Sequence, residues 1–143
     1  MLAATVLLSS GCALLGGSDV KRDESGAVVE SADADVLALK VGDCLNTAAL
    51  ASEVSSVPAV PCSEPHDSVI LSELTLTDAQ GLPTAESTAT NELIDTTCAT
   101  AFEAWTPTTG EASDWSYNYF LPTQGSWDSG DRLVQCLAVR AAE

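Results

Sequence analysis

Basic residues are scarce in this sequence: 5 Lys and Arg stand against 21 Asp and Glu in 143 residues, a net charge of −16 with one histidine. Because phosphate binding depends on Lys and Arg, this balance argues against nucleic acid as a partner. A zinc site needs about four Cys or His ligands, and a thiol oxidoreductase usually carries Cys-x-x-Cys, a motif that the sequence lacks. We therefore expect no metal and no cofactor.

Long apolar runs are also absent. Residues 2–8 are too few to span a bilayer, which needs about 20 helical residues. Followed by small residues and Cys12, they have the order of a secretion signal. Ser10-Gly11-Cys12 resembles the lipobox of bacterial lipoproteins, in which the cysteine is lipidated and becomes the first mature residue. An ordinary signal peptide with a free cysteine is the alternative. Since no Lys or Arg precedes the run, we expect translation to begin upstream of Met1.

The membrane is then the first expected partner, because acyl chains on Cys12 would hold the protein at the outer face of the cell membrane. Residues 13–35 contain Gly16-Gly17-Ser18 and scattered acids, with no sustained period of 2 or 3.6. This composition is typical of flexible linkers. We divide the chain into a lipoprotein signal peptide (1–11), a lipidated cysteine with a flexible acidic linker (12–35) and a domain (36–143).

Periodicity within residues 36–143 predicts an α+β domain. Apolar side chains recur at helical spacing from Ile94 to Trp105, with Cys98 on the buried face and Pro107 as the stop signal. Residues 68–76 carry two alternating apolar sets, which indicates either burial on both faces or a β-bulge. The expected fold is one helix packed on a small antiparallel sheet of about four to five strands, drawn from residues 36–41, 56–60, 68–76, 115–120 and 132–140. The last of these is apolar on both faces, as in a covered central strand.

Four cysteines lie in the predicted domain, and the compartment outside the membrane permits disulfides. Four cysteines allow three pairings. Cys44 and Cys62 end two neighbouring short strands, whereas Cys98 on the helix can meet Cys136 on the covered strand. This arrangement favours the disulfides Cys44–Cys62 and Cys98–Cys136, with the other two pairings as alternatives.

The only histidine, His66, lies among acids on a proline-flanked turn. With Glu64 and Asp67 as acids and Ser63 or Ser68 as nucleophile, it is a candidate for acid–base chemistry. A histidine beside acids at a turn more often fixes that turn by hydrogen bonds, and we favour this role. We therefore expect Glu64, His66 and Asp67 to fix the turn or to take part in an interaction, and we expect no catalytic residues.

Arg132 precedes the apolar part of the last strand. We expect it to pair with Asp43, Glu64 or Asp67, because such a pair would tie the last strand to the opening turn.

Trp127 and the aromatic residues of 115–119 are candidates for an exposed face that binds peptide or glycan, although such residues more often belong to the core. The segment 128–131 resembles half of a calcium loop, but it lacks the spaced acids and distal Glu of an EF-hand. We expect no calcium site there.

Several of these motifs occur together in one order: Val41-Gly42-Asp43-Cys44-Leu45, Val60-Pro61-Cys62-Ser63-Glu64-Pro65-His66-Asp67, the helical Cys98, and then Pro122, Trp127, Gly130-Asp131-Arg132, Val134 and Cys136. In this order the chain resembles the septum formation-related domain family of actinobacterial envelope proteins, over about residues 36–140. The resemblance implies an extracytoplasmic domain of membrane proteins or lipoproteins that is linked by name to cell division. It implies no catalytic residues.

The sequence predicts a lipid-anchored envelope protein with a non-catalytic interaction domain, whose partner is an unknown envelope protein, and the resemblance implies that this domain is related to septum formation. One alternative is a lipoprotein that binds a small ligand or glycan near the wall. The other is a hydrolase that depends on His66.

Overall fold

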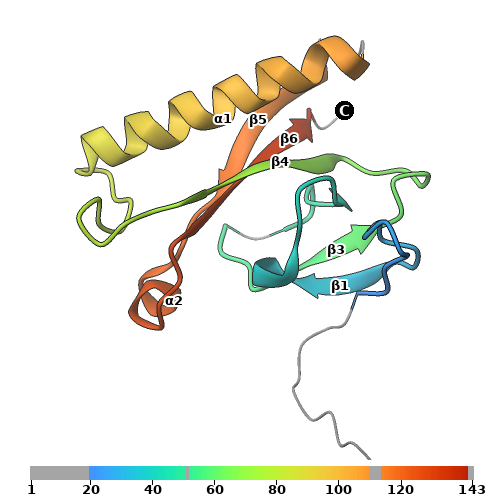
Figure 1. The fold of residues 1–143 in the computed structure, drawn as a ribbon, viewed down its shortest axis with the longest axis horizontal. Helices are drawn as coiled ribbons and strands as arrows, with labels where there is room; N and C mark the ends of the chain where they lie inside the picture. The colour runs from blue at the N-terminus through green and yellow to red at the C-terminus, as the bar shows by residue number, and fades with distance from the viewer. Residues whose placement is uncertain (1–19, 51, 110–113, 142–143) are drawn as a thin grey trace, which may run out of the picture.

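A computed structural model describes residues 20–50, 52–109 and 114–141 of the chain (Figure 1). Six strands form one antiparallel sheet in the order β1-β3-β2-β4-β6-β5. The strands are β1 (Ala32–Asp35), β2 (Cys44–Leu45), β3 (Ser56–Val60), β4 (Ser68–Thr75), β5 (Trp115–Phe120) and β6 (Leu133–Arg140). The predicted α+β class is confirmed, with six strands rather than four or five.

One long helix, α1 (Thr88–Thr109), lies across β4, β6 and β5 (Figure 1). Its buried face carries Ile94 and Cys98, as the helical spacing predicts. The helix ends two residues beyond Pro107 rather than before it. In the part of the chain that the structure describes, no helix has the length and apolarity of a membrane span.

Two clusters of buried residues lie on either side of β6. The helix-side core consists of Leu76, Ile94, Cys98, Val134 and Cys136, with Tyr117, Tyr119 and Trp127 packed against it. The strand-side core consists of Val28, Ala34, Leu39, Leu45, Val57, Ala59, Ile70 and Leu137. Because successive side chains of a strand point to opposite faces, β6 supplies both cores, as expected of a covered central strand.

Strand β4 reaches both cores by a different route. Its register with β6 shifts between Ile70 and Ser72, which marks a β-bulge or irregularity. Ile70 lies in the strand-side core, whereas Leu74 packs on the helix-side core, although the two residues have the same parity. One extra residue in a strand exchanges its two faces. The two apolar sets of residues 68–76 therefore follow from the bulge, one of the two alternatives expected.

The predicted flexible linker is wrong for residues 20–35, which belong to the domain. Arg22 and Val28 form an isolated bridge closed by a turn, and the glycine of this turn, Gly26, has a positive φ of 90°. Strand β1 then pairs with β3, and Ala34 is fully buried. In β1, alanine alternates with aspartate, which is the pattern of a strand with one buried face. Alanine is only weakly apolar, so this pattern is hard to recognise in the sequence. The domain therefore begins at or before residue 20, not at 36.

The strand expected at residues 36–41 is also wrong. Residues Val36–Ala38 form a short 3-10 helix, η1, whose N-terminus is capped because the Asp35 carboxylate accepts the Leu37 N–H at 2.8 Å. The chain then turns through Gly42 at a φ of 94°. The apolar run is mostly exposed, since Leu37 is 58% and Val41 56% accessible.

The long turn expected before the last strand contains a five-residue helix, α2 (Gln124–Asp128). Its start is fixed by a capping box in which Thr123 and Ser126 each bond the other's backbone N–H.

Candidate functional site at the Cys62–Asp67 turn

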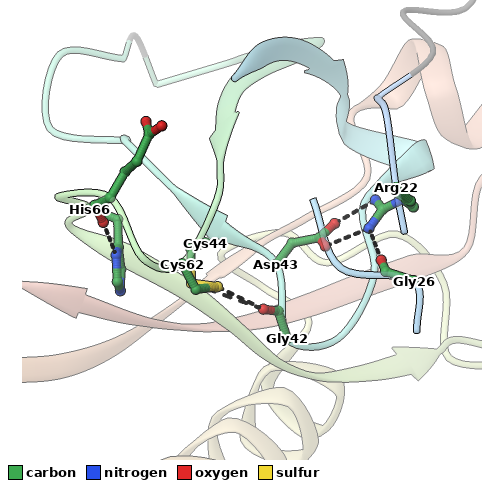
Figure 2. The surroundings of a disulfide bond; sticks show 8 residues. Arg22, Gly26, Gly42, Asp43, Cys44, Cys62 and His66 are labelled. Carbon is green, nitrogen blue, oxygen red and sulfur yellow. Dashed lines mark hydrogen bonds and ion pairs between the residues drawn. A yellow bond between two sulfur atoms is a disulfide. The ribbon is translucent and has the colours of Figure 1, made fainter. Parts of the chain in front are cut away.

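The turn between β3 and β4 is closed by its own backbone. The Glu64 N–H donates to the Pro61 carbonyl at 2.8 Å. His66 Nδ1 lies 2.8 Å from the Glu64 carbonyl oxygen, and Figure 2 shows this contact. Since a carbonyl can only accept, Nδ1 carries a proton and donates it. His66 is thus positioned for the turn-fixing role that the sequence suggested.

Asp67 joins this turn to the segment that follows β2. Its carboxylate accepts the N–H groups of Thr47 at 2.6 Å and Ala48 at 2.9 Å, as well as the Ser68 hydroxyl at 2.8 Å. Burial raises the pKa of Asp67, but these hydrogen bonds outweigh burial and hold that pKa below its ordinary value. The Asp67 carbonyl also accepts the Arg140 N–H at 2.7 Å, which links the turn to β6.

The structure forms both expected disulfides, Cys44–Cys62 and Cys98–Cys136. Cys98 and Cys136 are fully buried and join α1 to β6, whereas Cys62 is exposed and holds the turn to the 3%-accessible Cys44 of β2. The Cys98–Cys136 bond thus lies within the helix-side core, whereas the Cys44–Cys62 bond ties the turn to β2.

An ion pair lies next to the exposed disulfide (Figure 2). Arg22 donates from both terminal nitrogens to Asp43, at 2.6 and 2.7 Å. The side chains are 14% and 4% accessible, respectively. Asp43 also accepts the Lys40 N–H at 2.8 Å, and Arg22 donates to the Gly26 carbonyl at 2.9 Å. A bidentate pair with these additional bonds is well satisfied, and it attaches the first described residues to the Gly-Asp-Cys motif.

A surface depression of about 340 Å³ adjoins the turn and is lined by Ser63, Glu64, Pro65, His66, Trp115 and Arg140. The His66 and Trp115 ring centroids lie 6.4 Å apart, and the Arg140 guanidinium lies 5.0 Å from the Trp115 ring centroid. Trp115 is 8% accessible, so it forms the floor of the depression rather than a platform. Glu64 sits at its rim, where its carboxylate accepts the Ser31 hydroxyl at 3.0 Å.

The two serines considered as nucleophiles are arranged differently. Ser68 is fully buried, and its hydroxyl bonds Asp67 and Thr47. Ser63 shares the depression with His66, yet no hydrogen bond joins the two among the described residues. The Ser68 hydroxyl is therefore not accessible to a substrate, whereas Ser63 lies at the depression.

The expected pairing of Arg132 with Asp43, Glu64 or Asp67 is wrong. Its guanidinium lies 3.7 Å from the Trp127 ring centroid, donates to the Trp127 carbonyl at 2.7 Å and pairs with Asp78 at 2.9 Å. Arg132 therefore joins α2 to the loop after β4, at the opposite end of β6 from the Cys62–Asp67 turn.

Trp127 is consequently covered by Arg132 and packed on the helix-side core, together with Tyr117 and Tyr119. These three aromatic residues are half-buried at the margin of the helix-side core, and Tyr119 also lines two surface depressions beside β5. Within residues 20–50, 52–109 and 114–141, no group of three or more His, Cys, Asp or Glu could hold a metal ion. Cys12, the predicted lipidation site, lies outside the described residues.

Arg22 was not predicted as the partner of Asp43. One available signal was the Gly-Asp-Cys motif itself, since an acid before a cysteine on a strand has to be paired when it is buried. With only 5 basic residues in the chain, few candidates existed for that pairing.

A family model described as septum formation matches residues 10–136. No curated protein and no solved structure matches the chain. The matched region contains both disulfides, the Arg22–Asp43 pair and the Cys62–Asp67 turn. Because the match covers most of the sequence, the chain belongs to the septum formation family.

Proposed function

We propose that this protein is a lipid-anchored envelope protein whose domain acts at the division septum by binding another envelope component, without catalysis. The observation that carries the proposal is the family match over residues 10–136. Membership of this family supports a role related to septum formation and cell division.

The extracytoplasmic placement has two supports. Ser10-Gly11-Cys12 has the order of a lipidation site. Four cysteines form two disulfides, which persist outside the cytoplasm and are rare within it. The anchor is tested by labelling cells with an alkyne fatty acid: the protein takes up the label and the Cys12→Ser variant does not. Equal labelling of both would refute the anchor.

Binding rather than catalysis is supported by the way the turn uses its polar groups. His66 bonds the Glu64 carbonyl, and Asp67 bonds the backbone after β2, so both serve the fold. If the protein were a hydrolase that depends on His66, the His66→Ala variant would lose activity and keep its melting temperature. A turn-fixing histidine predicts a lower melting temperature.

The septal role is tested with the full-length protein fused at its C-terminus to a fluorophore that matures outside the membrane. We expect enrichment at the septum of dividing cells. A uniform signal along the membrane would contradict a septal role.

The second candidate is a small-ligand or glycan-binding envelope lipoprotein, and the depression beside His66, Trp115 and Arg140 favours it. Sedimentation with purified wall fragments tests this candidate. The control is another variant whose melting temperature is lowered as much as that of His66→Ala. Binding that is lost in His66→Ala but kept in this control would favour the glycan function over a protein partner.

A further inference from the structure

A second surface feature lies at the border of the strand-side core, beside η1 and the end of β5. Three depressions of about 290, 300 and 380 Å³ adjoin one another, and Val54 lines all three. The depressions of about 290 and 380 Å³ draw much of their apolar lining from η1, from Val54 and from the end of β5, including Val36, Leu37, Val54, Phe120 and Leu121. We call this feature the Val54 groove.

The groove gathers apolar side chains that face solvent. Leu37 is 58% and Leu121 39% accessible, and both line the depression of about 380 Å³. Single exposed leucines are ordinary on a protein surface, but two in one hollow form a continuous apolar patch. Val36, Val54 and Phe120 continue this patch inward, because they pack against the strand-side core. The walls are therefore supported from behind, as a binding surface requires.

The rim of the groove is acidic. Asp35, Glu53 and Asp131 line the same depression as the two leucines, and its described lining contains no Lys or Arg. Two of the carboxylates are held in place: Asp35 accepts the Leu37 N–H, and Asp131 accepts the Ser126 hydroxyl and the Leu133 N–H. Three acids around an apolar hollow attract cations and repel an acidic partner, and the chain's net charge of −16 acts in the same direction.

We infer that the Val54 groove binds a short cationic segment of a partner protein. An apolar side chain the size of leucine enters the hollow between Leu37 and Leu121, and flanking Lys or Arg residues meet the acidic rim. The inference rests on the proposed interaction function and names the chemistry of its partner.

The first test uses three fluorescein-labelled octapeptides, of alternating Lys and Leu, Lys and Ser, or Glu and Leu. Their binding to the full chain carrying Cys12→Ser is followed by fluorescence anisotropy at physiological salt. We expect the Lys-Leu peptide to bind at least about tenfold more tightly than either other peptide, a difference of about 1.4 kcal/mol. Equal binding of the Lys-Leu and Lys-Ser peptides would show attraction by net charge alone and would overturn the inference.

Matched variants locate the binding. Leu37→Ser and Leu121→Ser remove apolar groups from the groove, whereas Val41→Ser and Leu93→Ser remove groups of similar exposure, 56% and 38%, elsewhere. We expect each groove variant to weaken binding of the Lys-Leu peptide about tenfold and the control variants to leave it unchanged. Equal effects of groove and control variants would overturn the inference.

The acidic rim has its own matched pair. Glu53→Gln removes a charge from the groove, and Glu92→Gln removes one from an exposed position on α1. We expect only Glu53→Gln to weaken binding, by about threefold, and to reduce its dependence on salt. Equal losses in the two variants would again indicate net charge rather than the groove.

A photo-crosslinking amino acid at position 121 of the full chain, used in dividing cells, identifies the natural occupant. Mass spectrometry that maps the crosslink to a partner segment with an apolar residue between Lys or Arg supports the inference. Crosslinks to a second copy of the chain, or to its own residues 1–19, overturn it.

The septal fusion tests the proposed function independently of the groove. A septal protein that fails to bind the Lys-Leu peptide refutes only the groove, whereas a protein that binds it but is spread over the membrane refutes only the septal role.

Discussion

The helix-side core and the strand-side core lie on opposite faces of β6 and are built by different means. The helix-side core is covered by a helix of 22 residues and lies on two strands of eight residues each. A fully buried disulfide joins that helix to the sheet. Long elements with a continuous apolar face bury enough surface to define their own position.

The strand-side core is formed by shorter pieces. Strands β1, β2 and β3 have four, two and five residues, and η1 has three. Such short strands make few hydrogen bonds to one another, and polar side chains provide additional links between them. Arg22 pairs with Asp43, and the Asp67 carboxylate accepts the N–H groups of Thr47 and Ala48. The comparison indicates that polar and covalent links compensate where the strands are too short to hold the fold.

The largest expected effect compares the two disulfides. Replacing both Cys98 and Cys136 by Ala should cost about 4 kcal/mol in the free energy of unfolding, whereas the same change at Cys44 and Cys62 should cost about 3 kcal/mol, because the loops differ in length, 38 against 18 residues. The cavity left in the helix-side core widens this gap. Denaturation in urea measures both. A larger loss from the Cys44–Cys62 pair would reverse the comparison.

Breaking the ion pair tests the polar side of the comparison. Arg22→Met leaves the Asp43 carboxylate buried without its cation and should cost about 3 kcal/mol. Adding Asp43→Asn should recover part of that loss, because no charge then remains buried. The exposed pair of Lys21 with Glu30 is the matched control, and Lys21→Met should cost less than about 1 kcal/mol. Similar losses from Arg22→Met and Lys21→Met would show that the buried pair contributes nothing special.

Asp67 provides a pH-dependent version of the same test. Asp67→Asn should cost about 2 kcal/mol at neutral pH, since it weakens the hydrogen bonds to Thr47 and Ala48. The pKa of Asp67 is lowered in the fold, so its contribution is complete above its unfolded pKa of about 3.9 and is lost as the pH falls through the folded pKa.

The loss of stability between neutral and acid pH should therefore be smaller in Asp67→Asn than in the unaltered protein. The exposed Asp33→Asn is the control and should keep the full pH dependence. A normal acid response in Asp67→Asn would refute this role of the carboxylate.

The smallest effect is one of rate rather than stability. Cys62 is exposed, whereas Cys98 and Cys136 are fully buried, so a soluble thiol reaches only the first disulfide in the folded protein. Mild reduction followed by alkylation and mass spectrometry should label Cys44 and Cys62 first. Simultaneous labelling of all four cysteines would mean that both bonds open only on unfolding.

The helix-side core was the more predictable half. Ile94 and Cys98 lie on one face of a long periodic segment, and β5 and β6 alternate or are apolar throughout, so local patterns define these elements. The disulfide pairing followed from the placement of these elements. In the strand-side core, β3 was predicted at residues 56–60, but β1 and η1 were not. Strand β1 buries alanine rather than large apolar residues, and η1 follows from the cap at Asp35 rather than from a periodic pattern.

The candidate site divides in the same way. Contacts within the turn, such as His66 with the Glu64 carbonyl, follow from neighbours in sequence and could be anticipated. The acidic partners of Arg22 and Arg132 could not be anticipated, because they lie far away in the sequence. Asp43 is 21 residues from Arg22, and Asp78 is 54 residues from Arg132, so each pair depends on how the loops fold. The Val54 groove joins residues from at least four separate segments, within 35–37, 52–55 and 119–126 and at Asp131, and no local pattern marks it.

The two cores share β6, and this has a consequence for insertions and deletions. Val134 and Cys136 face the helix side, and Leu137 faces the strand side. A single inserted or deleted residue in β6 would move every later side chain to the wrong face, so that both cores lose their packing at once. A change of length in β6 therefore disturbs both cores unless a bulge of the kind found in β4 absorbs it, whereas a change of length in a loop leaves both faces of β6 in place.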